Sequence, residues 1–270
     1  MTRLFALLLA GAVSRQHLGP AVPAQVRRVV TLAPSLSEIV LALGAGDRLV
    51  GVTRFDDDPR VAKVARVGGY NDPEPETVLG LRPDLVLAQP APENRGPVET
   101  LARLGVPVEA FELTDLEEVE QAMEQIGVLL GLRERGRELR ADLERHRARV
   151  RADGARRPKV RALLVLGLDP LVVAGPRGFV GELLRDTGAV NAAGDSDRPF
   201  PRMSAEAAVR AQPDVIVICG FDPPPGRPPI PGLLRARIEK LRSNALLHPG
   251  PRLGEGLDDL VAALGGKRSP

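Results

Sequence analysis

The chain has 270 residues, of which 43% are hydrophobic and 27% charged, with 37 Lys and Arg side chains against 35 Asp and Glu. This composition is typical of an ordinary globular protein, and the length allows one large domain or two lobes to fold without a metal or disulfides. The balanced charge excludes the clustered positive field of a nucleic-acid-binding protein. With six Phe, one Tyr and no Trp, the position of each ring is informative.

Residues 1–24 have the pattern of a signal peptide. Arg3 gives a basic start, residues 4–13 form a short apolar run, and Val22-Pro23-Ala24 offer small residues for cleavage. The run is too short to span a bilayer, which takes about 20 residues, and no Cys follows it. We predict an exported, soluble protein without a lipid anchor; the alternative is an apolar N-terminal core segment.

Residues 25–113 alternate short β-rich runs with helical patterns. Strands are expected at 29–32, 49–53, 85–88 and 106–111, and helices at 98–104 and from Ser35 to Gly44, where Ser35 and Glu38 match a capping box. Continuous apolar strands that alternate with helices indicate a parallel sheet covered on both faces. This segment is the predicted N-terminal α/β lobe.

Residues 114–157 show no strand signal and form the predicted connector. Thr114 and Glu117 match a second capping box, and the following apolar residues keep helical spacing. Residues 133–152 are dense in Arg and Glu, which is typical of a solvated helix of about 30 Å. Such a helix could bridge two lobes; the alternative is a peripheral helix of one large domain.

Residues 158–270 repeat the pattern of the first lobe. Strands are expected at 160–166, 171–174 and 215–218, and helices at 180–185, 204–211 and 233–241. Cys219, the single cysteine, follows an apolar strand and is expected to be a buried small hydrophobe. The fold class is therefore α/β, with two Rossmann-like lobes.

An internal repeat relates the lobes. The same pattern occurs twice with an offset of 130 residues: an aromatic residue, then a Glu, then a Pro-Asp pair before a strand. The first set is Tyr70, Glu76, Pro83 and Asp84, and the second is Phe200, Glu206, Pro213 and Asp214. Equivalent loops of the two lobes should face a shared cleft, where ligands bind in such folds.

Motifs for catalysis are not found: there is no P-loop, HExxH or GxSxG pattern. After residue 24 the only histidines are His146 and His248, both in surface-like surroundings, so we expect no catalytic residues and no metal site built on histidines. The triplet Asp56-Asp57-Asp58 is interpreted as a solvated turn, the alternative being a weak cation site.

Several motifs together resemble the helical-backbone periplasmic substrate-binding proteins of ABC importers. They are Arg28 to Ser35 with Glu38, Gly51 to Phe55 with Asp57 and Pro59, Val67 to Tyr70, Leu81 to Val86, Gly167 to Pro170 with Gly175, Leu183 to Gly188 with Asn191, Phe200 to Glu206, and Pro251-Arg252. The likeness covers about residues 27–265 and is closest to the members that bind vitamin B12. Relative to the family, the chain is shorter around Ser243 to Leu247, where the last strand is expected to be missing or irregular.

The resemblance implies two lobes with parallel sheets joined by one long rigid helix, and a ligand cleft between them. It implies a periplasmic, monomeric receptor that has no resident cofactor and delivers cobalamin or a related corrinoid or metal chelate to a permease dimer with its ATPase subunits. Haem, with Tyr70 as a phenolate ligand, and ferric siderophores are the alternatives, and a tetrapyrrole-processing enzyme such as a chelatase is a third.

The resemblance also assigns residues. Phe55, Tyr70 and Phe200 match ring positions of the cleft, whereas Gln89 and Val172 stand where further rings are expected. Arg54, Arg202 and Arg252 are candidate donors to the ligand, and Glu76 and Glu206 match the residues that dock on the permease; the residue-based alternative for these two Glu is a favourable place at a helix N-terminus.

Overall fold

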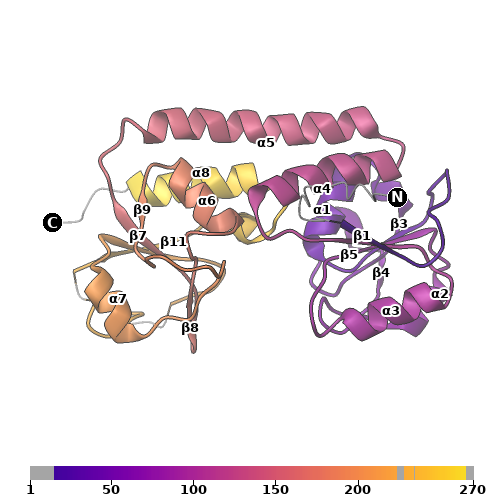
Figure 1. The fold of residues 1–270 in the computed structure, drawn as a ribbon, viewed down its shortest axis with the longest axis horizontal. Coiled ribbons are helices and arrows are strands. Elements are labelled where there is room, and N and C mark those ends of the chain that lie inside the picture. The colour runs from indigo at the N-terminus through magenta and orange to yellow at the C-terminus, as the bar shows by residue number, and fades with distance from the viewer. Residues whose placement is uncertain (1–14, 224–227, 234, 266–270) are drawn as a thin grey trace, which may run out of the picture.

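The computed structural model describes residues 15–223, 228–233 and 235–265, which form two α/β lobes side by side, bridged by a long helix (Figure 1). The sheet of the N-terminal lobe has the order β1-β6-β5-β2-β3-β4 and is parallel except for β1. Its strands are β1 Arg15–Leu18, β2 Val29–Thr31, β3 Leu49–Val52, β4 Ala65–Arg66, β5 Leu85–Ala88 and β6 Val108–Phe111. Its helices are α1 Pro34–Ala42, α2 Pro75–Gly80 and α3 Arg95–Arg103, with 3-10 turns η1 Gly46–Arg48 and η2 Pro59–Val61.

Both faces of this sheet are covered, as the uninterrupted apolar strands predict. On β5, Leu85 and Leu87 pack into the core that contains α1, whereas Val86 and Ala88 pack with residues of α2 and α3. Alternate residues of a strand point to opposite faces, so a strand buried on both sides must be apolar throughout.

The C-terminal lobe has the strand order β11-β10-β7-β8, with β9 paired to β7. The pairs β10-β11, β10-β7 and β7-β9 are parallel, whereas β7 and β8 form an antiparallel pair. The strands are β7 Arg161–Leu168, β8 Leu171–Val173, β9 Val190–Asn191, β10 Val215–Ile218 and β11 Arg237–Lys240. The helices are α6 Phe179–Asp186, α7 Ala205–Ala211 and α8 Leu253–Gly265, with the 3-10 turn η3 Ala245–Leu247. Cys219 is buried, as expected.

The helix predicted at 233–241 is wrong, because Arg237–Lys240 form the edge strand β11. The apolar side chains of Leu233 and Leu241 are buried, which suits helical spacing, but the backbone of 237–240 pairs in parallel with β10. A buried strand with an unpaired edge is costly, so tertiary pairing overrides the local pattern. The last strand thus ends at Lys240, and the segment 243–247 contains only the turn η3.

Atomic details support the internal repeat. In the N-terminal lobe Asp84 accepts hydrogen bonds from the backbone of Arg27 and Arg28, and the Arg28 guanidinium donates to Leu81 O at 2.7 Å. In the C-terminal lobe Asp214 accepts from Arg161 N at 2.9 Å, and the Arg161 guanidinium donates to Ala211 O at 2.9 Å. The same device thus ties a strand start to a helix end in both lobes.

The backbone follows the repeat as well. Arg82 and Gln212, again 130 residues apart, have φ angles of 47° and 46° in the left-handed region, which non-glycine residues rarely adopt. Gln212 directly follows α7, and Arg82 lies two residues after the last residue of α2; these are the helices that carry the repeated Glu. The lobes therefore share a local geometry that extends beyond their general fold.

The connector consists of α4 Leu116–Leu129 and α5 Arg133–Gly154. Its capping box is formed by Asp115 and Glu118, one residue later than the predicted pair Thr114 and Glu117. The box predicted at Ser35 and Glu38 is also wrong: α1 begins after Ala33 without a side-chain cap. In both cases the spacing of the polar residues does not determine which of them caps the helix. A neighbouring residue can make the capping hydrogen bond instead, or the polar side chain can bind a distant partner.

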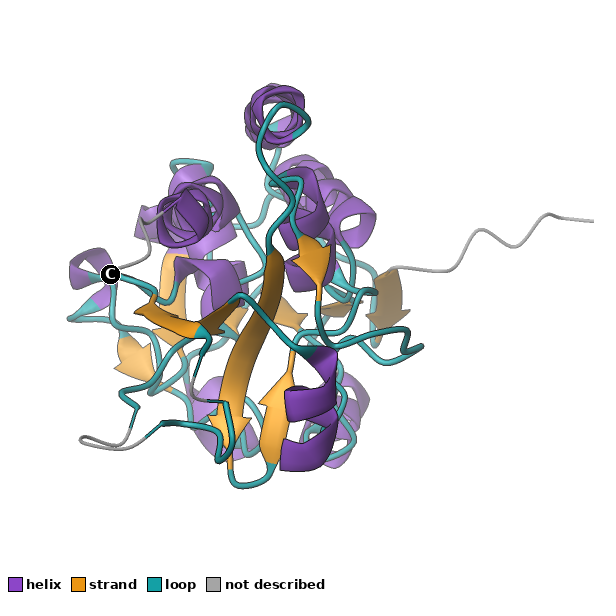
Figure 2. Cartoon of the chain, turned by 90° about the vertical axis from the view of Figure 1, so that its left-hand side faces the viewer, coloured by secondary structure: helices purple, strands orange, loops and turns teal. Residues whose placement is uncertain are grey.

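Helix α5 runs along one side of the molecule and passes over both lobes (Figures 1 and 2). It is anchored near each end by a glycine against neighbouring backbone. A Cβ on Gly136 would lie 2.9 Å from Met123 O of α4, and one on Gly154 would lie 2.5 Å from Thr187 O, just after α6. No larger side chain fits at these contacts, so α5 lies close to both lobes.

Between these anchors, a buried ion-pair cluster joins three helices. The Arg147 side chain of α5 is 12% exposed; it donates to Glu120 of α4 and, at 2.9 Å, to Asp186 of α6. Arg151 adds a second contact to Asp186 at 2.8 Å. Burial raises the pKa of Glu120, while the Arg147 guanidinium opposes that shift. One guanidinium thus links both connector helices to the C-terminal lobe.

We expect Arg147→Ala to destabilise the protein by about 3–5 kcal/mol, because it leaves the buried Glu120 carboxylate without its hydrogen-bonded counter-charge and the buried Asp186 with Arg151 alone. Urea unfolding measures the loss. Arg145→Ala, on the same helix but in an exposed pair with Asp142, is the control and should leave the midpoint nearly unchanged. Equal effects of the two substitutions would contradict the role assigned to Arg147.

The segment predicted as a signal peptide overlaps the fold. Its residues 1–14 lie outside the described residues, but Arg15–Leu18 form β1, which pairs antiparallel with β6. Arg15 donates to the buried carboxylate of Glu109 at 2.6 and 2.7 Å, and His17 Nδ1 lies 2.9 Å from it. A chain that begins at Gln25 would lack this edge strand and leave Glu109 without these two partners.

A chain beginning at Gln25 should therefore be less stable than one beginning at Arg15, by roughly 2–4 kcal/mol. The shorter chain loses hydrogen bonds, each of which contributes a net of about 1 kcal/mol to stability, or about 1.5–3 kcal/mol where one partner is charged. Denaturant unfolding of the two purified chains gives the comparison. Coincident unfolding curves would show that β1 contributes nothing to the stability of the fold.

Candidate functional site

A pocket of about 630 Å³ lies between the lobes. The N-terminal lobe contributes Ala33, Pro34, Ser35, Arg54, Phe55, Tyr70, Asn71, Asp72 and Gln89, and the C-terminal lobe contributes Leu166, Phe179, Phe200, Leu247, His248 and Pro249. The structure therefore brings together Arg54, Phe55, Tyr70 and Phe200. The first and last of them, Arg54 and Phe200, are 146 positions apart in the sequence.

The loop after β3 carries Arg54 and Phe55 into this pocket. Asp56 closes the loop, because its buried carboxylate accepts from Thr53 N at 2.8 Å and from Thr53 Oγ1 at 2.6 Å. Burial raises the pKa of Asp56, although the hydrogen bonds act in the opposite direction. The first residue of the acidic triplet is thus a buried loop anchor, so its interpretation as part of a solvated turn is wrong; Asp57 is exposed.

Arg54 is held over the ring that follows it. Its guanidinium carbon lies 5.0 Å from the Phe55 ring centroid, and NH2 donates to both oxygens of Asp72 at 2.6 and 2.7 Å. A cation over a ring face is a favourable contact. Phe55 nevertheless remains 57% exposed, which leaves most of the ring available to a ligand.

Tyr70 lies on the next loop, where two hydrogen bonds fix its position. Its hydroxyl donates to Pro90 O at 3.1 Å, and its carbonyl accepts from the buried amide of Asn94 at 3.0 Å. Burial raises the pKa of the phenol, and the carboxylates of Glu112 and Glu93 raise it further. The structure therefore favours the protonated phenol.

The C-terminal wall is aromatic and aliphatic. Phe179 opens α6 and is buried, and its ring packs edge-to-face with that of Phe200 at 6.1 Å between centroids. Phe200 remains 41% exposed. Sequence reasoning did not select Phe179; the signal available for it was its place next to the start of the predicted helix 180–185.

Other predicted ligand residues lie elsewhere. Arg202 and Val172 form an isolated bridge with each other, and neither lines the pocket. Arg252 also lies outside the lining and donates to Glu38 and Glu255. Gln89 does line the pocket, at the position where a ring was expected. Direct contact of Arg202 and Arg252 with a ligand stays a prediction.

Sequence reasoning missed an inter-lobe contact at this pocket. Glu38 of α1 is buried, and its Oε1 lies 2.7 Å from His248 Nδ1 and 3.3 Å from an Arg252 nitrogen, both in the C-terminal lobe. His248 is therefore not in a surface setting: it lines the pocket with a side chain that is 18% exposed. These residues are 210 positions apart in sequence, so no local pattern could pair them.

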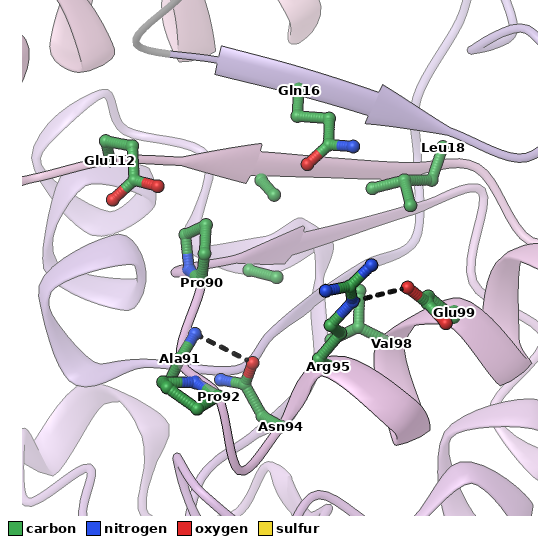
Figure 3. Close-up of a pocket in the computed structure, with 12 residues that line it drawn as sticks. Gln16, Leu18, Pro90, Ala91, Pro92, Asn94, Arg95, Val98, Glu99 and Glu112 are labelled. Carbon is green, nitrogen blue, oxygen red and sulfur yellow. Dashed lines mark hydrogen bonds and ion pairs between the residues drawn. The ribbon is translucent and has the colours of Figure 1, made fainter.

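A second pocket, of about 540 Å³, belongs to the N-terminal lobe alone (Figure 3). It lies beside β1 and the start of α3 and is lined by residues that include Gln16, Leu18, Asn94, Arg95 and Glu112. Arg95 is paired there with Glu99, and Asn94 with Ala91 N. None of the predicted ligand residues lines it, so the inter-lobe pocket is the better candidate.

Glu76 and Glu206 lie on equivalent helices of the two lobes. Each is exposed in the first turn of its helix, α2 and α7 respectively. Both helices lie on the side of the molecule opposite α5 (Figure 1). Backbone and Ser204 hydrogen bonds lower the pKa of Glu206, so this exposed side chain is an anion at neutral pH.

The sequence matches the family model described as periplasmic binding protein over residues 29–221. The chain belongs to the periplasmic binding protein family. No helix within the described ranges is both long and apolar enough to cross a bilayer.

Relatives of this periplasmic binding protein include proteins named as vitamin B12-binding and as heme-binding. It is 31% identical to a vitamin B12-binding protein of Yersinia pestis over 219 residues, which cover 80% of this chain and 78% of the relative. The solved vitamin B12-binding protein BtuF of Vibrio cholerae has a TM-score of 0.75 and 25% identity, covering 90% and 98% of the two chains. A periplasmic heme-binding protein of Pseudomonas aeruginosa has a TM-score of 0.77 and 29% identity, covering 90% and 94%.

The chemistry of the pocket is that of a binding site. Within the described residues, no group of three or more His, Cys, Asp and Glu side chains is placed to hold a metal ion. The pocket offers rings, prolines and a few fixed polar groups, the usual composition of a site for a large, mostly apolar ligand.

We expect Asp56→Ala to lower stability by about 1–3 kcal/mol, because it removes the acceptor for a buried amide and a buried hydroxyl. Asp56→Asn keeps an acceptor oxygen and should recover most of the loss, and the exposed Asp57→Ala serves as the control. Urea unfolding and hydrogen exchange at Thr53 and Phe55 provide the measurements. If Asp56→Ala and Asp57→Ala behave alike, Asp56 does not fix the loop.

Proposed function

We propose that the protein is the periplasmic substrate-binding component of an ABC importer and that it captures cobalamin or a related corrinoid or metal chelate. The observation that carries the proposal is the inter-lobe pocket, in which one ring from each lobe, Phe55 and Phe200, is partly exposed. Apolar surface gains about 25 cal/mol for each Å² removed from water, so a large flat ligand that covers both rings would bind favourably.

Cobalamin is the first candidate because vitamin B12-binding proteins are among the relatives in both sequence and structure. Haem is the second, since heme-binding proteins have equally similar folds. The raised pKa of Tyr70 and its hydrogen bond to Pro90 O favour the phenol over the phenolate that would bind iron. A ferric siderophore remains a third ligand class.

A binding role without catalysis or resident cofactor fits the described residues best. The named relatives are binding proteins. A chelatase would need a titratable group beside the bound metal that moves protons during turnover. Measured insertion or removal of metal from a tetrapyrrole by the purified protein would overturn this part of the proposal.

The partner we propose is a permease dimer with its ATPase subunits, approached by a monomeric receptor. Glu76 and Glu206 occupy equivalent positions in the repeat, on helices at the side of the molecule away from α5. Paired Glu–Arg contacts on two related surfaces would fix orientation as well as add affinity.

Export to the periplasm is part of the proposal. We place the end of the leader before Arg15, because β1 completes the N-terminal sheet and supplies two partners to the buried Glu109. The mature chain would then retain residues 15–24.

Titration calorimetry of the folded chain against cyanocobalamin, haemin and a siderophore panel tests the ligand. We expect a Kd for cyanocobalamin in the micromolar range or tighter, and a weakening of about 10-fold to 100-fold in the Phe55→Ala and Phe200→Ala variants, since a buried ring contributes about 1.5–3 kcal/mol. Leu104→Ala, an exposed apolar residue outside the pocket, is the control. Failure of all three ligand classes to bind would refute the proposed cargo.

Docking is tested separately from binding. Glu76→Ala combined with Glu206→Ala should abolish uptake through the cognate importer while ligand affinity stays within about twofold, because neither residue lines the pocket. Glu134→Ala combined with Glu138→Ala changes the charge equally on α5 and should leave uptake intact. Loss of ligand affinity in the first pair would instead assign these residues to the cleft.

A further inference from the structure

We infer that His248, positioned by Glu38, is an axial ligand to the metal of the bound chelate. The inference rests on the proposed function and deepens it, since it names the chemistry that the pocket recognises: a planar macrocyclic chelate whose metal has an exchangeable axial position. Three features of the pocket support this role: the place of His248, its hydrogen bond, and the state of the competing donor Tyr70.

His248 reaches the inter-lobe pocket from the C-terminal lobe. It follows η3 directly, and it lines the pocket together with its neighbours Leu247 and Pro249. Its side chain is 18% exposed, so part of the ring reaches the pocket while the rest is packed. Because the opposite walls carry Phe55 and Tyr70, a flat ligand between the lobes would lie near this imidazole.

The hydrogen bond of His248 assigns the two ring nitrogens different roles. Nδ1 lies 2.7 Å from Glu38 Oε1, and a carboxylate only accepts, so Nδ1 carries the proton and donates it. Among the described residues Nε2 has no hydrogen-bond partner. It is not one of the buried side-chain atoms that lack a partner, so Nε2 is accessible. In the neutral ring Nε2 therefore presents a lone pair at an accessible position.

This arrangement is the one that metal-binding histidines use. A ligating imidazole commonly donates its second N–H to a carboxylate, which fixes the tautomer and raises the basicity of the ligating nitrogen. Glu38 is well held for this role, because it is buried in α1 and also accepts from Arg252 at 3.3 Å. The permanently charged Arg252 balances the carboxylate.

A single nitrogen is sufficient for such a cargo. The described residues hold no cluster of three or more metal-ligating side chains, so a bare ion has no site there. A macrocycle already supplies four in-plane nitrogens, and the protein need only add one axial donor. The pocket thus selects a chelate, whose metal would contact the protein at one face of the macrocycle.

Tyr70 is the competing donor in the same pocket. Its hydroxyl already donates to Pro90 O, and burial raises the pKa of the phenol, so it must lose both its proton and its hydrogen bond before it can bind a metal. His248 Nε2 requires neither change. The two residues come from opposite lobes, and their contributions can be separated by substitution.

Absorption spectra of the intact chain mixed with haemin and with aquocobalamin test the inference. Replacement of the exchangeable axial ligand by imidazole shifts the absorption bands, and we expect this shift in the wild type and in Tyr70→Phe. His248→Gln should lose it, because the amide can donate to Glu38 but offers no nitrogen lone pair; added imidazole should restore it in His248→Ala.

Controls separate ligation from folding and from simple packing. His146→Ala removes the histidine of α5, which is paired with Asp258, and should leave the spectra unchanged. Glu38→Gln should weaken haemin and aquocobalamin binding by about 10-fold to 100-fold, as loss of a carboxylate partner typically does. Cyanocobalamin, whose cyanide is firmly held, should bind His248→Gln and the wild type alike.

The outcomes are distinct. Chelate binding by calorimetry with spectra that do not depend on His248, or a shift that disappears in Tyr70→Phe, overturns the axial role and leaves the receptor standing. If the folded wild type binds no chelate, the proposed cargo and the axial role are refuted together. Circular dichroism of each variant establishes that it is folded.

Discussion

The buried cluster around Arg147 is the contact on which the arrangement of the two lobes depends. Its guanidinium contacts carboxylates from α4 and α6, so the connector helix α4, which shares a core with α1 of the first lobe, and a helix of the second lobe are held against the same side chain of α5. Two carboxylates and one guanidinium, each taken from water, are favourable only when their mutual geometry is maintained. Any movement that separates the lobes at this side of the molecule would expose or unpair these charges.

The inter-lobe pocket is less tightly packed than the contacts along α5. Its rings are partly exposed, and its polar contacts, such as that of Arg54 with Asp72, connect neighbouring loops of the same lobe. The contact of Glu38 with His248 and Arg252 is the exception, because it joins the lobes at the wall of the pocket. Tight helix packing along α5 and sparse contact across the pocket fit a receptor whose cleft is shaped in advance and admits a bulky cargo.

The sequence was most informative where local order decides the structure. Strands 85–88 and 215–218 are found at their predicted positions, and the repeat predicted from Pro83-Asp84 and Pro213-Asp214 extends to matching hydrogen bonds. Local patterns failed where a distant partner decides. The segment 237–240 has helical spacing but pairs with β10, and Glu38 resembles a capping residue but binds His248, 210 positions away. Asp56 was interpreted as part of a solvated turn and Asn94 was not selected, because the role of each depends on burial, which composition does not reveal.

Gly136 and Gly154, which hold α5 against neighbouring backbone, restrict how the length of this helix can change during evolution. Gly136 and Gly154 are eighteen residues apart, and at 3.6 residues per turn this separation is about five full turns, so both lie on one face of the helix. Inserting or deleting a single residue between them would turn one anchor by about 100° away from its partner backbone. Descendants of this chain can therefore exchange most side chains along α5 freely, whereas the spacing of the helix is inherited as a fixed length.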